Sequence, residues 1–259
     1  MLVCIGICHK DFLASARLFR WMVELDGQHE RHSLVLVVSR GMVKHHSELS
    51  IKKARKAFKS VEVIMPNMMH EKGWPTSANN LFITAYHYAN KLKQNFQWIE
   101  SDCVPLCPGW LDRMESEYLK CGKPFMGCIY SKPFPHLTGC AIYPYNLEKY
   151  NPYILRPGER AWDVAEPGNT MPHTHHTELF QHEWGNHKYN ISPSFSNQAC
   201  LSVLRPQAVL FHRNKDQTLI ERLRERKKHP LTAQLIASTM KGEITPSWAE
   251  DYEWKVVVK

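Results

Sequence analysis

The sequence has no apolar run long enough to cross a lipid bilayer, which takes roughly 18 consecutive apolar residues. Its apolar start, residues 2–8, leads directly into His9, Lys10 and Asp11 and lacks the architecture of a signal peptide. We therefore expect a soluble, cytoplasmic protein that does not bind membranes. No obligate protein partner is evident, and there are no internal repeats or low-complexity tracts.

The sequence also lacks the paired cysteines of a structural zinc site. Its eight cysteines, at positions 4, 8, 103, 107, 121, 128, 140 and 200, form no CxxC pair. Several lie inside apolar runs, where a thiol packs as a small core residue. We expect these cysteines to be reduced and structural.

Acidic residues are outnumbered by basic ones, so the net charge is +8 and the pI is about 9.0. This balance favours an anionic partner, and either a nucleotide diphosphate or a nucleic acid would satisfy it. Much of the excess lies in residues 222–228, which we expect on an exposed helix. A solvated basic surface is the alternative interpretation of this run.

Short β-rich runs alternate with helical patterns in the first half, which predicts an α/β fold with a mixed, mostly parallel sheet flanked by helices. A domain should cover residues 1–217, with a nucleotide-binding half at 1–105 and an acceptor half at 106–217 that includes an irregular segment at 146–198. A C-terminal helical extension should follow at 218–259. The expected strands are 2–8, 34–38, 61–65, 97–100, 125–130, 138–143 and 208–211, and helices are expected from residue 12, at 50–59, around 81–92 and at 218–227.

Two acids follow the apolar run Trp98-Ile99, namely Glu100 and Asp102. Side chains at positions i and i+2 of a strand point the same way, so we expect both carboxylates on one face. Ligands bind at the carboxyl ends of strands in open α/β sheets. Such a pair can hold a hard divalent cation, although an acidic pair at a strand end is weak evidence by itself.

The acid-x-Asp pattern, followed by Pro105 and by Pro-Gly-Trp-Leu at residues 108–111, resembles the metal-binding motif of glycosyltransferases with the GT-A fold. This resemblance implies a Rossmann-like nucleotide-binding domain and a hexosyltransferase that uses a nucleotide-sugar donor, with uridine as the expected base. It assigns Asp102 to a manganese or magnesium ion that bridges the donor's two phosphates. Glu100 departs from the commoner Asp and is expected to reach the ribose or a metal-bound water.

A second match to these enzymes lies late in the chain, where an apolar strand is followed by His212 and Lys215. By resemblance, His212 completes the metal shell and Lys215 neutralises the diphosphate leaving group. Taken alone, a histidine after an apolar strand is more often a surface residue.

Donor-binding positions are also expected at the loop after the first strand and before a central helix. In the family, the nucleotide lies where His9, Lys10 and Asp11 follow the first strand, and a helix N-terminus there attracts anions. Asp11 could equally serve only as a helix cap. Asn79, in residues 73–80, resembles a position that contacts the donor sugar or diphosphate.

Catalysis needs either a base on the acceptor hydroxyl, which inverts the anomeric carbon, or an arrangement in which the leaving diphosphate assists, and the sequence leaves both open. For the first, Asp163 lies in the region in which inverting members of the family place their base, and Glu166 is the substitute. Either acid could instead cap a short helix. The turn at residues 138–141 contains Gly139, and the family often has a small glycine turn beside the donor sugar, where a side chain would clash.

Five histidines lie close together in the irregular segment, and zinc binding, acceptor contact and plain loop composition all remain open for them. They are His173, His175, His176, His182 and His187.

The acceptor is less well indicated. The size, the charge and the style of the motifs resemble phage enzymes that glycosylate hydroxymethylated pyrimidines in DNA, which would place the protein in the host cytoplasm. A flipped base would then need stacking partners, and Trp162, Trp184 and Phe195 could provide them or could be core residues. A cell-surface glycan, a small-molecule acceptor, nucleotidyl transfer and a non-catalytic nucleic-acid-binding module are the alternatives.

Overall fold

The computed structural model describes residues 1–67, 73–131, 134–182, 204–213 and 218–227, which divide into two compact units. Unit 1 consists of Met1–Ser101 and Leu111–Thr177, and unit 2 consists of Asp102–Trp110 and the chain from Glu178 onward. None of the helices in these ranges is long and apolar enough to span a membrane. The domain boundaries at residues 105 and 217 stay a prediction.

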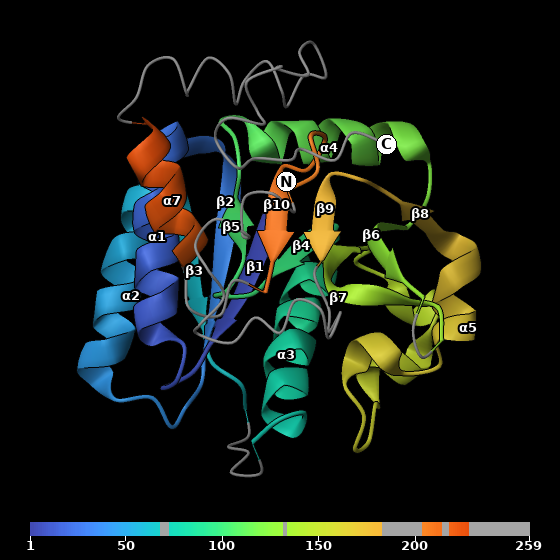
Figure 1. The fold of residues 1–259 in the computed structure, drawn as a ribbon. Helices are drawn as coiled ribbons and strands as arrows, with labels where there is room; N and C mark the ends of the chain where they lie inside the picture. The colour runs from blue at the N-terminus through green and yellow to red at the C-terminus, as the bar shows by residue number, and fades with distance from the viewer. Residues whose placement is uncertain (68–72, 132–133, 183–203, 214–217, 228–259) are drawn as a thin grey trace. The chain divides into compact units, whose positions relative to one another are not determined.

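Unit 1 contains a seven-stranded sheet in the order β3-β2-β1-β4-β7-β6-β8 (Figure 1). β1 pairs in parallel with β2 and β4, β2 with β3, and β6 with β8, whereas β7 runs antiparallel to β4 and β6. The predicted α/β fold with a mixed, mostly parallel sheet is confirmed. The strands are β1 (Leu2–Ile7), β2 (His29–Val38), β3 (Phe58–Ile64), β4 (Phe96–Ile99), β6 (Phe125–Tyr130), β7 (His136–Tyr143) and β8 (Thr174–His176).

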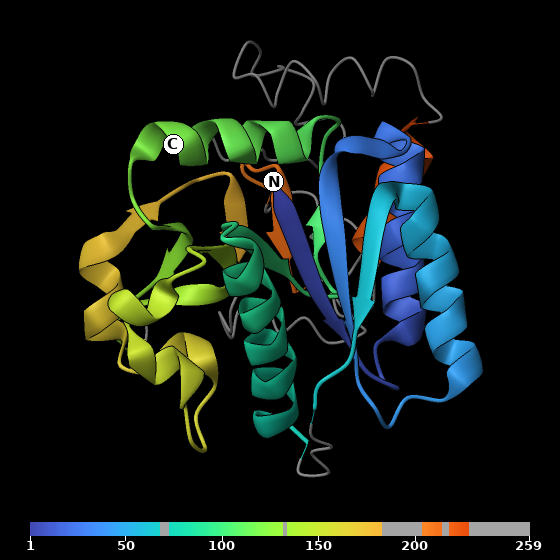
Figure 2. The same ribbon diagram turned by 180° about the vertical axis from the view of Figure 1, so that it is seen from behind.

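Four main helices accompany this sheet: α1 (Phe12–Asp26), α2 (Lys44–Ala57), α3 (Thr76–Leu92) and α4 (Trp110–Cys121), the last in unit 1 from Leu111 onward. α1 and α2 lie side by side in both views (Figures 1 and 2), and the buried hydroxyls of Ser15 and Ser50 are 3.0 Å apart between them. α2 begins before the predicted Ser50, and α4 was not predicted.

α3 covers the face of β1 that carries Leu2, Cys4 and Gly6. A Cβ on Gly6 would lie 2.9 Å from side-chain carbons of both Leu81 and Trp98, so glycine permits this close approach of helix and sheet. The strand is apolar on both faces because parallel strands in such sheets are buried on both sides.

Aromatic rings fill the core between α3 and the neighbouring strands. The Phe82 ring stacks on Trp162 with centroids 4.8 Å apart and also contacts Trp98 and Tyr143. Trp162 is only 4% exposed, so it is a core residue and the idea that it stacks on a flipped base was wrong. The other two residues proposed for stacking, Trp184 and Phe195, lie outside the described residues.

The irregular segment that was predicted from residue 146 consists of short helical turns as far as β8. These turns are η1 (Leu147–Lys149), η2 (Pro152–Leu155), η3 (Trp162–Val164), α5 (Pro167–Thr170) and η4 (Met171–His173).

Unit 2 contains a three-stranded sheet in the order β5-β10-β9, built from β5 (Val104–Pro105), β9 (Phe180–His182) and β10 (Leu210–His212). β10 is antiparallel to β5 and parallel to β9. α7 (Thr218–Lys227) has the predicted bounds. Within it Arg222 pairs with Glu225, and Arg224 with Glu221, so part of the basic run is neutralised by its own helix.

Candidate active site

Asp102 and His212 meet at one end of the small sheet in unit 2. Asp102 lies just before β5, and His212 is the last residue of β10, the partner strand of β5. Asp102 Oδ1 is 3.4 Å from His212 Nε2, and the two side chains are 6% and 9% exposed. The structure therefore brings together, from distant parts of the sequence, the two residues that were selected as metal ligands.

This pair fits a divalent cation chemically. A carboxylate oxygen and an imidazole nitrogen are suitable ligands for manganese and magnesium sites, with the nitrogen favouring manganese. Burying a carboxylate is costly unless a positive partner compensates it, and a cation or a protonated imidazole would do so. A buried Asp-His contact at a sheet end is thus an arrangement in which a cation is energetically useful.

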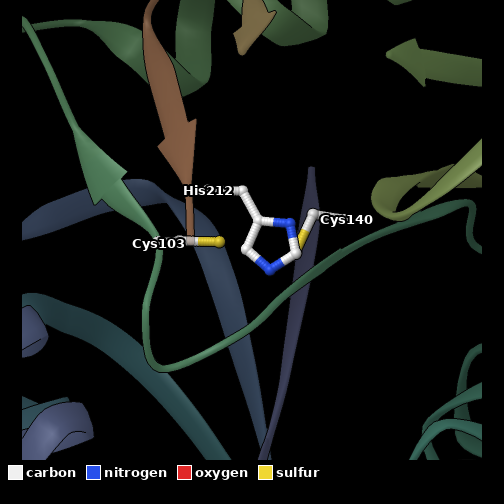
Figure 3. A group of neighbouring side chains, drawn as sticks. All are labelled: Cys103, Cys140 and His212. Carbon is white, nitrogen blue, oxygen red and sulfur yellow. The ribbon is translucent and has the colours of Figure 1, made fainter. Parts of the chain in front are cut away.

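Cys103 is another neighbour of the His212 ring within unit 2. Figure 3 shows its thiol beside the His212 ring, and its sulfur lies within 4.8 Å of a ring nitrogen. Cys103 is fully buried, in agreement with its predicted role as a core thiol. A sulfur ligand favours softer metals than the Asp102 carboxylate does.

His182 is the other close neighbour of His212. The two residues are in register between the parallel strands β9 and β10, and their Nδ1 atoms are 2.8 Å apart. Arg213, directly after His212, has φ 84°, a left-handed conformation that is unfavourable for a residue with a side chain. This conformation occurs directly where the strand β10 ends at His212.

Glu100 lies in unit 1, directly after β4 ends at Ile99, and Asp102 lies in the turn that follows. Neither acid is a strand residue, so strand alternation does not decide whether the two carboxylates point the same way. Glu100 flanks Gly139 of β7 together with Asp163. A Cβ on Gly139 would lie 3.3 Å from Asp163 Oδ2 and 3.5 Å from Glu100 Oε1.

Tyr143 and Trp162 are hydrogen-bonded to each other, and Tyr143 also to Gly139, next to Glu100 and Asp163. Trp162 Nε1 donates to Tyr143 Oη, at 3.3 Å, and that hydroxyl donates to the Gly139 carbonyl, at 2.8 Å. Burial, followed by the negative charge of Asp163, raises the pKa of Tyr143 well above 10. The phenol therefore stays protonated and keeps its donor role at any physiological pH. Neither Tyr143 nor this arrangement was predicted.

Asn79 connects α3 to the segment that carries Asp163. Its side-chain nitrogen donates to the Arg160 carbonyl at 2.7 Å, and its side-chain oxygen accepts from the Trp162 amide at 3.0 Å. The residue is 4% exposed. In this structure Asn79 holds the chain in place beside Asp163, and its contact with a donor stays a prediction.

The loop after β1 places His9 and Lys10 at the surface and Asp11 at the start of α1. Asp11 occupies the N-cap position, but its side chain makes no capping bond. Its carboxylate instead accepts a hydrogen bond from the Cys8 thiol at 2.8 Å. Burial and this carboxylate raise the pKa of Cys8 to about 11, so the thiol is protonated.

Glu166, the alternative base, is exposed, has φ 46° and lies 3.6 Å from the Arg160 guanidinium. It precedes α5 without making a capping bond. Lys215 lies outside the described residues, so its phosphate contact is untested.

The described members of the histidine group each contact a different partner. His173 contacts the Tyr150 ring, His175 Nε2 lies 3.1 Å from Glu117, and His176 Nδ1 accepts from the Ile129 amide. His182 belongs to unit 2, and His187 lies outside the described part of the chain. No disulfide joins any two of the seven cysteines that the structure describes, and Cys200 lies outside the described residues.

Comparison with solved structures shows which fold this is. An active-site mutant of LgtC superposes with a TM-score of 0.57 at 8% identity, over 97% of this chain and 100% of that chain. The fold is that of the GT-A glycosyltransferases. Mouse xyloside xylosyltransferase 1 gives a TM-score of 0.52 at 11% identity, over 82% of this chain and 96% of that chain.

The bifunctional glycosyltransferase WbbM gives a TM-score of 0.54 at 8% identity, and the match covers 97% of this chain but 51% of that chain. No protein-family model matches the sequence, and neither does any curated protein. At these identities the likeness shows the GT-A fold alone. It does not identify the donor or the acceptor.

Proposed function

We propose that this protein is a metal-dependent glycosyltransferase, which moves a sugar from a nucleotide-diphosphate donor, a UDP-sugar, to an acceptor hydroxyl. The observation that carries the proposal is the buried Asp102–His212 pair, at 3.4 Å, in a chain that has the fold of the GT-A glycosyltransferases. On this proposal the acidic motif and the late histidine serve one cation, manganese or magnesium.

The two ligands have separate tasks. Asp102 supplies a negatively charged oxygen and His212 a neutral nitrogen, and the bound cation would withdraw charge from the diphosphate as it departs. The remaining donor contacts are proposed for Glu100 at the ribose and for Lys215 at a phosphate oxygen. The other proposed donor-binding residues are His9, Lys10, Asp11 and Asn79.

Asp163 is the proposed base. Its carboxylate would accept the proton of the acceptor hydroxyl, while the acceptor oxygen forms a bond to the anomeric carbon. The bond from that carbon to the diphosphate oxygen breaks, and its electron pair leaves with the diphosphate, so the configuration inverts. Asp163 suits this task better than Glu166, because it is half-buried beside Gly139 whereas Glu166 is exposed and paired with Arg160.

Replacing Asp102 tests the proposal. Asp102→Ala should lower the release of nucleoside diphosphate from a UDP-sugar at least about hundredfold, because it removes the charged ligand of the cation. The measurement is a donor screen with manganese that detects nucleoside diphosphate. Glu48→Ala is the control, since that carboxylate is 61% exposed on α2. Turnover that survives in Asp102→Ala would rule out the proposed mechanism.

The same assay separates other functions. Nucleotidyl transfer would release pyrophosphate in place of nucleoside diphosphate. A non-catalytic nucleic-acid-binding module would hydrolyse no nucleotide-sugar and would bind DNA equally well with and without Asp102.

The net charge of +8 favours an anionic acceptor, and a 5-hydroxymethylpyrimidine in phage DNA is the proposed one. Contacts between lysine or arginine and phosphates weaken steeply with salt. Transfer to hydroxymethylated DNA should therefore fall sharply between low and moderate salt. If transfer does not depend on salt and is faster to a glycan or a small molecule, that compound is the acceptor and DNA is not.

A further inference from the structure

His182 lies beside the proposed ligand His212 on the neighbouring strand. In neighbouring parallel strands, residues in register project from the same face, and His182 and His212 are such a pair. Their rings are tilted by 58° with centroids 4.7 Å apart, and their Nδ1 atoms are 2.8 Å apart. This distance is that of a hydrogen bond between the two rings.

A hydrogen bond between two ring nitrogens contains one proton, so one Nδ1 atom is the donor and the other is the acceptor. Each ring then has its Nε2 left for another contact. His212 Nε2 is the atom that faces Asp102 Oδ1, so a cation held by this pair takes the lone pair of Nε2. A neutral His212 then carries its proton on Nδ1 and donates it to Nδ1 of His182. Such outer partners orient a ligating imidazole and fix its tautomer.

We propose that His182 is a positioning residue, which holds the His212 ring in the orientation and the tautomer that offer Nε2 to the cation. This inference rests on the proposed function, because it assigns the cation to Asp102 and His212. His182 itself does not ligate that cation. Its Nδ1 accepts the hydrogen bond from His212, so a neutral His182 carries its own proton on Nε2 and has no free lone pair for a metal.

Paired amide substitutions separate this role from simple packing. The amide of asparagine stands where Nδ1 of histidine does, and the amide of glutamine stands where Nε2 does. His182→Asn should therefore keep a hydrogen bond to His212, whereas His182→Gln and His182→Phe should lose it. Loss of an outer partner typically costs 10–100-fold in metal affinity.

The measurement is Mn²⁺ binding without donor, followed by the electron paramagnetic resonance signal of free Mn²⁺, with thermal unfolding to confirm the fold of each variant. We expect the dissociation constant to stay within about threefold for His182→Asn and to rise at least about tenfold for His182→Gln and His182→Phe. Equal affinity in wild type, Asn and Gln variants would overturn the role of His182 and leave the proposed function intact. A wild-type protein that binds no Mn²⁺ would overturn the proposed function itself, and this inference with it.

Discussion

At the scale of single residues, Gly139 determines how closely the acidic side chains approach the sheet. Its missing Cβ leaves room for Asp163, Glu100 and the edge of Trp162, which would lie at 3.1–3.5 Å from such a carbon. Its carbonyl accepts the Tyr143 hydroxyl. A small glycine turn was expected at residues 138–141, but Gly139 lies inside the strand β7, so that expectation was wrong. A side chain at this position would crowd the protein's own carboxylates.

Gly139→Ala tests this packing. The added methyl group should displace Asp163 and lower kcat about tenfold or more, because misplacing a catalytic group is costly. It should also destabilise the protein by about 1–3 kcal/mol through overpacking. Turnover with a UDP-sugar and urea unfolding are the measurements. Gly168→Ala is the matched control, since nothing lies within 4 Å of a Cβ there. Equal activity of the two variants would show that this glycine is not required.

At the scale of elements, the sequence located the regular strands and helices better than their ends. The strand at 125–130 and the helix at 218–227 have their predicted bounds, because apolar periodicity and charge mark them clearly. β5 and β9 were missed because two or three residues give no periodic signal, and they form only as partners of β10. His182 was therefore assigned to a loop cluster, although it is a strand residue.

The junction of α1 and β2 contains His29, whose buried side chain lies against the Phe58 ring with centroids 4.9 Å apart. Burial, reinforced by nearby His32, lowers the pKa of His29 from 6.5 to about 4, while Asp112 acts in the opposite direction. In the unfolded chain the His29 imidazole is protonated below about pH 6.5, whereas in the folded protein it is protonated only below about pH 4. Stability should therefore fall as the pH decreases through this window, by up to about 3 kcal/mol.

Urea unfolding at pH 7 and pH 4.5 checks this dependence on His29. The wild-type protein and the control His87→Leu, at an exposed position of α3, should lose similar stability on acidification. His29→Leu should lose clearly less, since it has no group to protonate. The same loss in all three proteins would assign the effect to other groups.

At the scale of the whole molecule, binding of a cation to the folded state alone should raise its stability by mass action. At a Mn²⁺ concentration of about 100 times Kd this amounts to about 2.7 kcal/mol, or roughly 5–10 °C in Tm for a chain of this size. Differential scanning fluorimetry with Mn²⁺ and with a chelator should show this shift in wild type and not in Asp102→Ala. An equal shift in both proteins would place the cation elsewhere.

The sequence by itself determined the alternation of strands and helices, the acid-x-Asp motif and the late histidine, because periodicity and short motifs are local properties. Only the tertiary structure decided that Asp102 and His212 meet at 3.4 Å, that His182 bonds to His212 and that Asn79 supports the segment before Asp163. Strand pairing and core packing join residues far apart in the chain, and their register cannot be derived from local pattern alone.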